Sequence, residues 1–141
     1  MAGGEITGSV TNSGDVDIDG RLTGALVNSG TAVVAGRITG TTDNTSLFTI
    51  NDGSVGVFNN TGTATLNVND ASVSGDLTNS GTATINIDGA LDMNFNDLIL
   101  SGGVIDLDNG GADDEITDVF NLTLTDATTT TIQVDQDRDT S

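Results

Sequence analysis

A sixteen-residue repeat organises the first half of this 141-residue chain. Asparagine occupies one position of each copy, and glycines recur with the same spacing. After three intervals of sixteen and one of nineteen, these asparagines are Asn12, Asn28, Asn44, Asn60 and Asn79. A self-similar period this short means that each copy is one structural unit stacked on its neighbour. The repeat therefore restricts the chain to array architectures.

Polar and apolar residues alternate within each copy. From residue 5 to 51 every charged residue has an odd number, and the large apolar residues have even numbers, with three exceptions (Val27, Val33, Leu47). Alternation with a period of two marks strands with one buried and one wet face, and an even repeat length keeps the same face inward. After the step of nineteen, the predicted inward set moves to odd numbers: Val73, Leu77, Asn79, Ala83, Ile85, Ile87, Leu91, Met93 and Phe95.

A repeat of this length does not build a propeller blade of about 40 residues, nor the longer strands and two-residue turns of hairpins. It fits one coil of a β-solenoid, in which short parallel strands stack about 4.8 Å apart. We therefore predict an all-β fold, a single-stranded parallel β-helix with coils of sixteen to nineteen residues. The predicted core columns are Ile6/Leu22/Ile38, Val16/Ala32/Phe48/Ala64/Ala83 and Ile18/Val34/Ile50/Leu66/Ile85.

One domain with three parts is expected from this pattern. Residues 1–4 form an expression start or linker, 5–125 the solenoid repeats, and 126–141 a last coil or a truncated tail. Solenoids usually need polar caps, and none precedes the repeats, so we expect a segment cut from a longer array. Uncapped ends expose backbone edges. A homo-oligomer formed by end-to-end or edge stacking is therefore expected.

The asparagine column, at inward positions, is predicted to lie at the bends of the coils. Gly tolerates a positive φ, and Asn is the next most tolerant residue. Stacked Asn side chains also bond one another and the nearby backbone. We therefore interpret the column as a structural ladder, and a ligand-binding column is the alternative.

The charge is strongly acidic, with 21 acidic residues against three arginines and no Lys or His, for a net charge of −18. Such a surface repels phosphate, so we expect no nucleic-acid partner. No apolar run approaches the ~20 residues of a membrane span, so we expect no membrane insertion. Acidic composition without lysine favours a location outside the cell or on a bacterial cell surface. Cysteine is absent, so cysteine usage does not indicate the redox compartment in which the protein works.

Two acidic stretches are candidates for binding calcium, the one cofactor that the sequence suggests. The D-x-D-x-D-G run that begins at Asp15 lacks the bidentate Glu of a calcium loop, because Leu26 stands at that position. We interpret its three Asp residues as the wet face of a strand. The second stretch offers hard oxygen ligands beside a glycine-rich loop, and a solvated loop is the alternative. Its candidate ligands are Asp106, Asp108, Asp113 and Asp114.

Ice binding and catalysis are two further hypotheses. Threonine pairs at residues 63–65 and 82–84 are typical of flat ice-binding arrays, but other coils place Asp, Val and Leu in the same columns. The chain contains no His or Cys, the residues on which nucleophilic catalysis most often depends. The four Phe residues, with no Trp or Tyr, show no platform for a sugar ring. We therefore expect no enzyme, and a carbohydrate-active β-helix is the least favoured hypothesis.

Three segments carry a family resemblance: I-T-G-S-V-T-N-S-G from Ile6, L-T-G-A-L-V-N-S-G from Leu22 and S-G-D-L-T-N-S-G-T-A-T-I-N-I-D-G from Ser74. They resemble the repeats of bacterial autotransporter passengers and related haemagglutinin-like adhesins. The stretch 102–114 is similar to one often found late in such passengers, and together these segments cover roughly residues 5–125.

That resemblance implies a right-handed parallel β-helix, export to the cell surface, and a role as an adhesin, stalk or spacer. It implies no catalytic residues. The sixteen-residue coil is shorter than is usual for the family, and neither its signal sequence nor its outer-membrane barrel occurs in this sequence. We therefore expect an acidic extracellular β-solenoid that acts as a stalk, an adhesin passenger or a surface-fibre segment. Its partner would be an unidentified ligand on a host or matrix surface.

Overall fold

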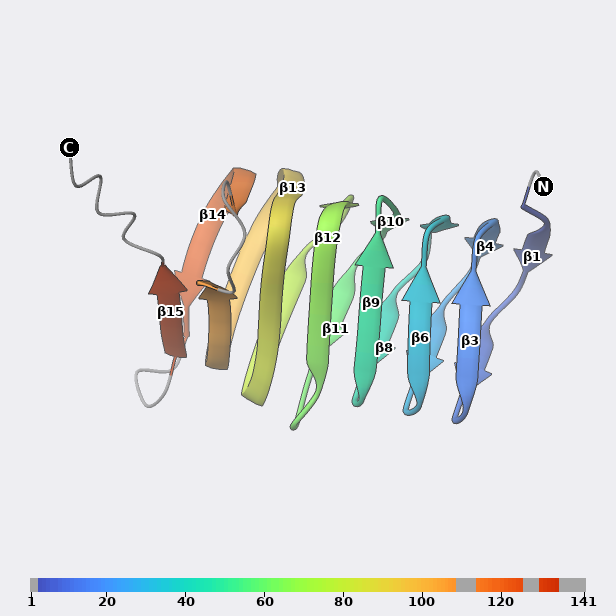
Figure 1. Ribbon diagram of the computed structural model, residues 1–141, viewed down its shortest axis with the longest axis horizontal. Coiled ribbons are helices and arrows are strands. Elements are labelled where there is room, and N and C mark those ends of the chain that lie inside the picture. The colour runs from blue at the N-terminus through green and yellow to red at the C-terminus, as the bar shows by residue number, and fades with distance from the viewer. Residues whose placement is uncertain (1–2, 109–113, 126–129, 135–141) are drawn as a thin grey trace.

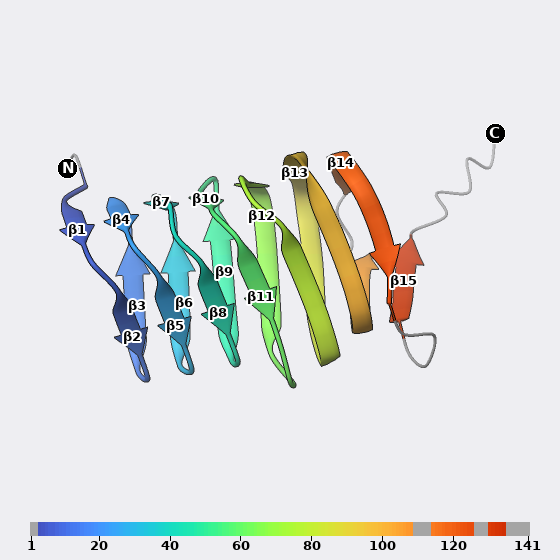
Figure 2. The same ribbon diagram turned by 180° about the vertical axis from the view of Figure 1, so that it is seen from behind.

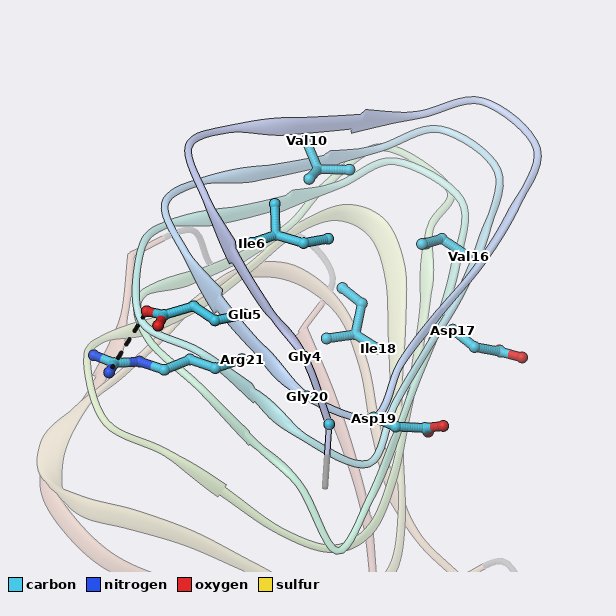
Figure 3. Close-up of a pocket in the computed structure, with 11 residues that line it drawn as sticks. Gly4, Glu5, Ile6, Val10, Val16, Asp17, Ile18, Asp19, Gly20 and Arg21 are labelled. Atoms are coloured by element: carbon cyan, nitrogen blue, oxygen red, sulfur yellow. Dashed lines mark ion pairs between the residues drawn. The ribbon is translucent and has the colours of Figure 1, made fainter. Parts of the chain in front are cut away.

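The computed structural model describes residues 3–108, 114–125 and 130–134. Their regular structure is all β-strand, wound into a β-solenoid of about five turns. Equivalent strands of successive coils lie side by side along the long axis (Figures 1 and 2). Seen from the N-terminal end, the chain turns clockwise as it recedes, so the solenoid is right-handed (Figures 1 and 3). The predicted all-β parallel β-helix is confirmed.

The first coils are triangular in cross-section, with one short strand on each side (Figure 3). The first face stacks β1 (Glu5–Thr7), β4 (Arg21–Thr23), β7 (Arg37–Ile38), β10 (Ser54–Val55) and the end of β12 (Thr65–Val73). The second stacks β2 (Val10–Asn12), β5 (Leu26–Asn28), β8 (Thr42–Asn44) and β11 (Phe58–Asn60). The third stacks β3 (Asp15–Ile18), β6 (Thr31–Val34), β9 (Leu47–Asn51) and the start of β12.

The later coils are built from longer strands. β13 (Leu77–Leu107) continues around the corners of the solenoid and pairs with both β11 and β12. β14 (Glu115–Leu124) and β15 (Thr130–Val134) then pair with β13. Most of the predicted final segment, 126–141, lies outside the described residues, but its described part, β15, continues the parallel stack.

Pairing is parallel and stacks each position of the first three coils on its counterpart in the next repeat. Ile6 pairs with Leu22, and Leu22 pairs with Ile38. The inward apolar side chains of these and later coils form one continuous core, in which the Phe48 and Phe58 rings meet edge to face with centroids 4.9 Å apart. Burying each such aliphatic side chain contributes about 1.5–3 kcal/mol. Because every coil contacts only its neighbours, stability comes from stacking.

Glycine is required where the backbones of two coils approach each other. A Cβ atom added at Gly30 would lie 2.1 Å from the Gly14 carbonyl oxygen, and one added at Gly36 would lie 1.9 Å from the Gly20 oxygen. Neither glycine has a positive φ. The ladder asparagines also lack a positive φ. Close packing of the coils, rather than left-handed backbone, therefore explains these two glycines.

Two predicted core columns are wrong beyond the third coil. Phe48 pairs with Leu66 and Ile50 pairs with Val68, each a step of 18, instead of with Ala64 and Leu66. Two extra residues lie in the turn that follows the fourth ladder asparagine. Because an even insertion preserves the inward face, the alternation alone did not reveal the change of register.

The predicted inward position of Phe95 is also wrong, since this side chain is 71% exposed. Asn94 and Phe95 both have a positive φ, and the register with β14 shifts on either side of Asn96. This bulge turns Phe95 outward, and the inward set then returns to even numbers at Leu98 and Leu100.

The last coils are longer than the predicted range of sixteen to nineteen. Leu91 pairs with Ile116, a step of 25, and Ile105 pairs with Ile132, a step of 27. The coils therefore widen from the N-terminal end towards the C-terminal end, as the view along the axis shows (Figure 3).

Candidate functional site

The asparagine column forms the predicted ladder inside the solenoid. Asn12 is 7% exposed, and the four ladder asparagines after it have no exposed surface: Asn28, Asn44, Asn60 and Asn79. Each Nδ2 donates to the Oδ1 of the next asparagine, at 2.8, 2.8, 2.9 and 2.9 Å. The amides are thus bonded in series along the solenoid. A buried, mutually bonded column is structural and leaves no room for a ligand.

Each ladder amide also bonds the backbone of the next coil. The Nδ2 of Asn28 donates to the Leu47 carbonyl at 3.0 Å, and the Nδ2 of Asn60 donates to the Thr84 carbonyl at 3.0 Å. Buried polar groups are costly unless they are paired. Because the column satisfies its donors in this way, asparagine is tolerated at the bends where an aliphatic residue would leave backbone carbonyls unpaired.

The ladder ends at Asn79, beneath a pair of glycines. The Nδ2 of Asn79 donates to the carbonyl oxygens of Ala83 and Gly102, at 2.9 and 3.2 Å. A Cβ atom at Gly103 would lie 2.6 Å from that Nδ2 atom. The next coil therefore brings its backbone to Asn79 where earlier coils bring another asparagine.

A second set of polar side chains forms a groove on the outer surface of the third face. Its cavity of about 380 Å³ is lined by Thr49, Asn67, Asn69, Asn86, Asp88 and Asp106. Within it, the Nδ2 of Asn86 donates to the Oδ1 of Asn67 at 2.8 Å, and Asn69 donates to Asn51. This outer array was not predicted. The recurring pattern of an aliphatic residue followed by Asn or Asp, in 66–69, 85–88 and 105–108, is the signal that identifies it.

The four predicted calcium ligands have different surroundings. Asp106 lines the outer groove, and its Oδ1 accepts a hydrogen bond from the backbone N–H of Asp108, which is exposed. Asp114 accepts from the backbone N–H of Gly89 at 2.8 Å, while its buried Oδ2 has no partner among the described residues. Asp113 lies outside the described residues. Calcium binding at these positions stays a prediction.

No group of three or more His, Cys, Asp or Glu side chains within residues 3–108, 114–125 and 130–134 is arranged to hold a metal ion. The outer groove instead combines two carboxylates, Asp88 and Asp106, with side-chain amides. Oxygen atoms of both kinds are ligands that Ca²⁺ accepts. The groove thus gathers oxygen atoms of the kinds that a hard cation binds.

The outer threonines do not form a uniform array. Register places Asp15, Thr31, Leu47, Thr65 and Thr84 in one column on the outside of the third face. An acidic residue and an exposed leucine interrupt the hydroxyl groups of this column. The three Asp residues of the D-x-D-x-D-G run are exposed, as predicted.

The N-terminal end of the solenoid is open. Figure 3 shows Ile6, Val10, Val16 and Ile18 directed into the triangle of the first coil, and the surrounding cavity of about 380 Å³ is open to solvent. Ile6 is 55% exposed, although Leu22, which stacks on it, is fully buried. An ion pair of 3.8 Å between Glu5 and Arg21 lies on the outer rim. Ile6 was predicted to be in the core, and its exposure shows that an inward position is buried only between two coils.

No family model, curated protein or solved structure matches this chain. Residues 3–108, 114–125 and 130–134 also contain no helix with the length and apolarity needed to cross a bilayer.

Proposed function

We propose that this chain is a structural and interaction module, a stiff acidic β-solenoid that serves as a stalk, an adhesin passenger or a surface-fibre segment. It works outside the cell or on a bacterial cell surface. The resemblance of its repeats to autotransporter passengers and its lysine-free acidic composition support this location. Its mechanism is mechanical and steric, because stacked coils hold a presented surface at a distance.

The ladder carries this proposal. Four side-chain bonds in series link the coils from Asn12 to Asn79, in addition to the parallel backbone pairing and the continuous apolar core. Force along the solenoid is then opposed at each coil boundary by buried bonds that water does not reach. A stiff solenoid of this kind is better suited to act as a spacer than a flexible linker is.

Force spectroscopy tests the mechanical role. Because the chain has no cysteine, Gly4→Cys and Thr131→Cys provide unique attachment points. We expect extension in discrete steps of about one coil, and Asn44→Ala should lower the force of the steps. Asp43→Ala, which changes the exposed neighbour on the same strand, is the matched control. Smooth extension without steps, as in an unfolded chain, would contradict the proposal.

The location is tested separately with antibodies raised against the folded chain. Staining of intact, unpermeabilised source cells is expected. Staining that requires permeabilisation argues against a surface role. Binding of the labelled chain to panels of matrix proteins and glycans would then decide between an adhesin and a passive stalk.

Calcium binding in the outer groove is a second candidate function, favoured by the carboxylates of Asp88 and Asp106 beside side-chain amides. Calorimetry with CaCl₂ should show a saturable site that Asp106→Asn weakens by about tenfold or more. The control is Asp19→Asn, which removes an equal charge from the exposed rim. Equal weakening by both variants would indicate diffuse attraction to an acidic surface instead of a site.

A further inference from the structure

The corner between the first and second faces carries a phenylalanine with a left-handed backbone. Five earlier coils place glycine at this corner, and the first two of these glycines have a positive φ: Gly8, Gly24, Gly40, Gly56 and Gly75. In the coil built by β13, Asn94 and Phe95 lie at the corner, with φ angles of 47° and 60°. A bulky side chain at such an angle is an outlier, whereas glycine adopts it without strain. Backbone strain of this kind is concentrated at functional sites.

The Phe95 side chain is 71% exposed although coils flank it on both sides. On its own coil, Asp92 pairs with Ser72 of the coil before and with Thr117 of the coil after. The bulge itself, and not the end of a stack, therefore turns the ring outward. We refer to residues 92–97 as the Phe95 bulge.

Hydrogen bonds hold the Phe95 bulge in one shape. The backbone N–H of Asn94 donates to the Oδ1 of Asp92 at 2.7 Å. The Nδ2 of Asn96 donates to the carbonyl oxygens of Met93 and Asn94, at 2.8 and 3.2 Å. A side chain presented on a fixed backbone loses little conformational entropy when a partner covers it. The bulge therefore presents Phe95 in advance of any contact.

Aspartates surround the Phe95 bulge on its own coil and on the coils before and after: Asp76, Asp92, Asp97 and Asp118. The Oδ1 of Asp76 accepts the N–H of Asp97 at 3.2 Å, and the Oδ1 of Asp97 accepts from Asn121 at 2.9 Å. These bonds orient the carboxylates without neutralising them. The two arginines among the described residues, Arg21 and Arg37, lie on β4 and β7 in earlier coils. The charge at the bulge is thus unpaired.

We propose that the Phe95 bulge binds a basic, partly apolar peptide segment of a partner protein. Apolar side chains of the segment cover the Phe95 ring, and its Lys or Arg side chains face the surrounding carboxylates. This inference rests on the interaction role proposed above and names the chemistry of the partner. Its failure would leave the stalk role intact, because force spectroscopy tests that role without a partner.

Charge selects this partner over other classes. An exposed aromatic ring at the centre of a contact supplies a buried anchor, and the face of the ring also attracts cations. A neutral sugar stacked on Phe95 would leave the carboxylates around it without a counter-charge. An anionic glycan would be repelled by them. A basic segment satisfies both the ring and the carboxylates, since complementary charge brings the partner to the site.

NMR titration of the isotope-labelled full chain tests the site. The probe is the capped peptide Lys-Leu-Lys-Leu-Lys, and Lys-Ser-Lys-Ser-Lys, Glu-Leu-Glu-Leu-Glu and maltohexaose are the comparison ligands. We expect the first peptide to shift the amide signals of residues 92–97 and to bind more tightly than the other three. Uniform small shifts over the whole chain, no shifts, or tighter binding of a comparison ligand would overturn the proposal.

Phe95→Gly separates the ring from the charge. This variant should raise the Kd of the Lys-Leu peptide by about fivefold or more and leave that of the Lys-Ser peptide unchanged. Val57→Gly is the matched control, because Val57 is a 39% exposed apolar residue at the same corner two coils earlier. It should change neither Kd. Equal effects of the two variants on the Lys-Leu peptide would contradict an anchor at Phe95.

Thermal unfolding of Phe95→Gly distinguishes a binding role from a folding role. Glycine adopts the φ of 60° without strain, as at the same corner of earlier coils. The variant should therefore keep or raise the melting temperature while it loses affinity for the peptide. A lower melting temperature would show that the ring stabilises the fold, and the proposal would fail.

Discussion

Two adjacent asparagines, Asn59 and Asn60, have opposite environments on one strand. Asn60 is fully buried and bonded to the ladder on both sides, while Asn59 is half-buried and donates to Asp43 on the outer surface at 2.7 Å. Amino-acid composition does not distinguish these two asparagines. Their energetic weight differs because a buried amide that loses its partner cannot turn to water.

Replacing Asn60 by Ala should lower the free energy of unfolding by about 2–4 kcal/mol, since it removes hydrogen bonds and leaves the amides of Asn44 and Asn79 incompletely paired. Replacing Asn59 by Ala should change it by about 0.5 kcal/mol or less. Urea unfolding of both variants measures the difference. A ladder without energetic weight would give equal losses.

Thr42 presents the reverse case, a polar side chain in an otherwise apolar column. It stacks between Leu26 and Phe58, and its buried Oγ1 has no partner among the described residues. Thr42→Val removes the hydroxyl at nearly constant volume and should raise the free energy of unfolding by about 1–2 kcal/mol. Thermal melts beside Thr41→Val, at the half-buried neighbour, provide the check. A destabilised Thr42→Val protein would show that the hydroxyl has an unidentified partner.

At the level of the strands, the alternation predicted which side of each strand faces inward but not how far apart the coils lie. Parity alone identified the buried positions in β5 and β9, whereas in β12 the buried set changes from even to odd numbers at the bulge between Asn69 and Ala71. An insertion of two residues before β12 left that parity intact, so the shift to a step of 18 was invisible. The bulge at Phe95 arises from positive φ angles that the alternation does not record.

The candidate sites also differ in whether the sequence could predict them. The ladder was predictable because it repeats at one spacing and its residues bond their own copies. The outer groove was missed, since its asparagines recur after steps of 18 and 19 and are partly exposed. Asp106 enters this groove only because β13 carries it across the third face. The position of Asp106 beside the groove asparagines depends on how the coils are aligned in three dimensions. The spacing of acidic residues along the chain does not give that alignment.

Glycines between coils provide a test of stacking. Gly14 and Gly30 occupy equivalent positions, but a Cβ atom at Gly14 would meet nothing within 4 Å, whereas one at Gly30 would strike the backbone. Gly30→Ala should therefore lower the free energy of unfolding by about 2 kcal/mol or more, and Gly14→Ala should be neutral or slightly stabilising. Chemical denaturation at low protein concentration makes the comparison. Equal tolerance of alanine would mean that the coils are not in close contact.

For the whole molecule, the net charge of −18 sets the response to ions. Exposed carboxylates repel one another along the solenoid, and salt screens this repulsion over a Debye length of about 8–10 Å at physiological ionic strength. Adding NaCl should therefore raise the melting temperature by several degrees. CaCl₂ at the same ionic strength should raise it further if the outer groove binds the ion, and chelation should remove only that excess. An unchanged midpoint in NaCl would eliminate repulsion as a destabilising factor.

Residues 21–36 make one complete coil. The coil before it and the coil after it have similar sequences and pair with it in register. Tandem duplication of such a block would add one layer of about 4.8 Å without turning any side chain inside out. The same freedom does not extend to the wide layers after β12, whose circuits differ in length from one another. Duplication of whole coils can therefore lengthen the solenoid within its regular part, but not within the wide coils after β12.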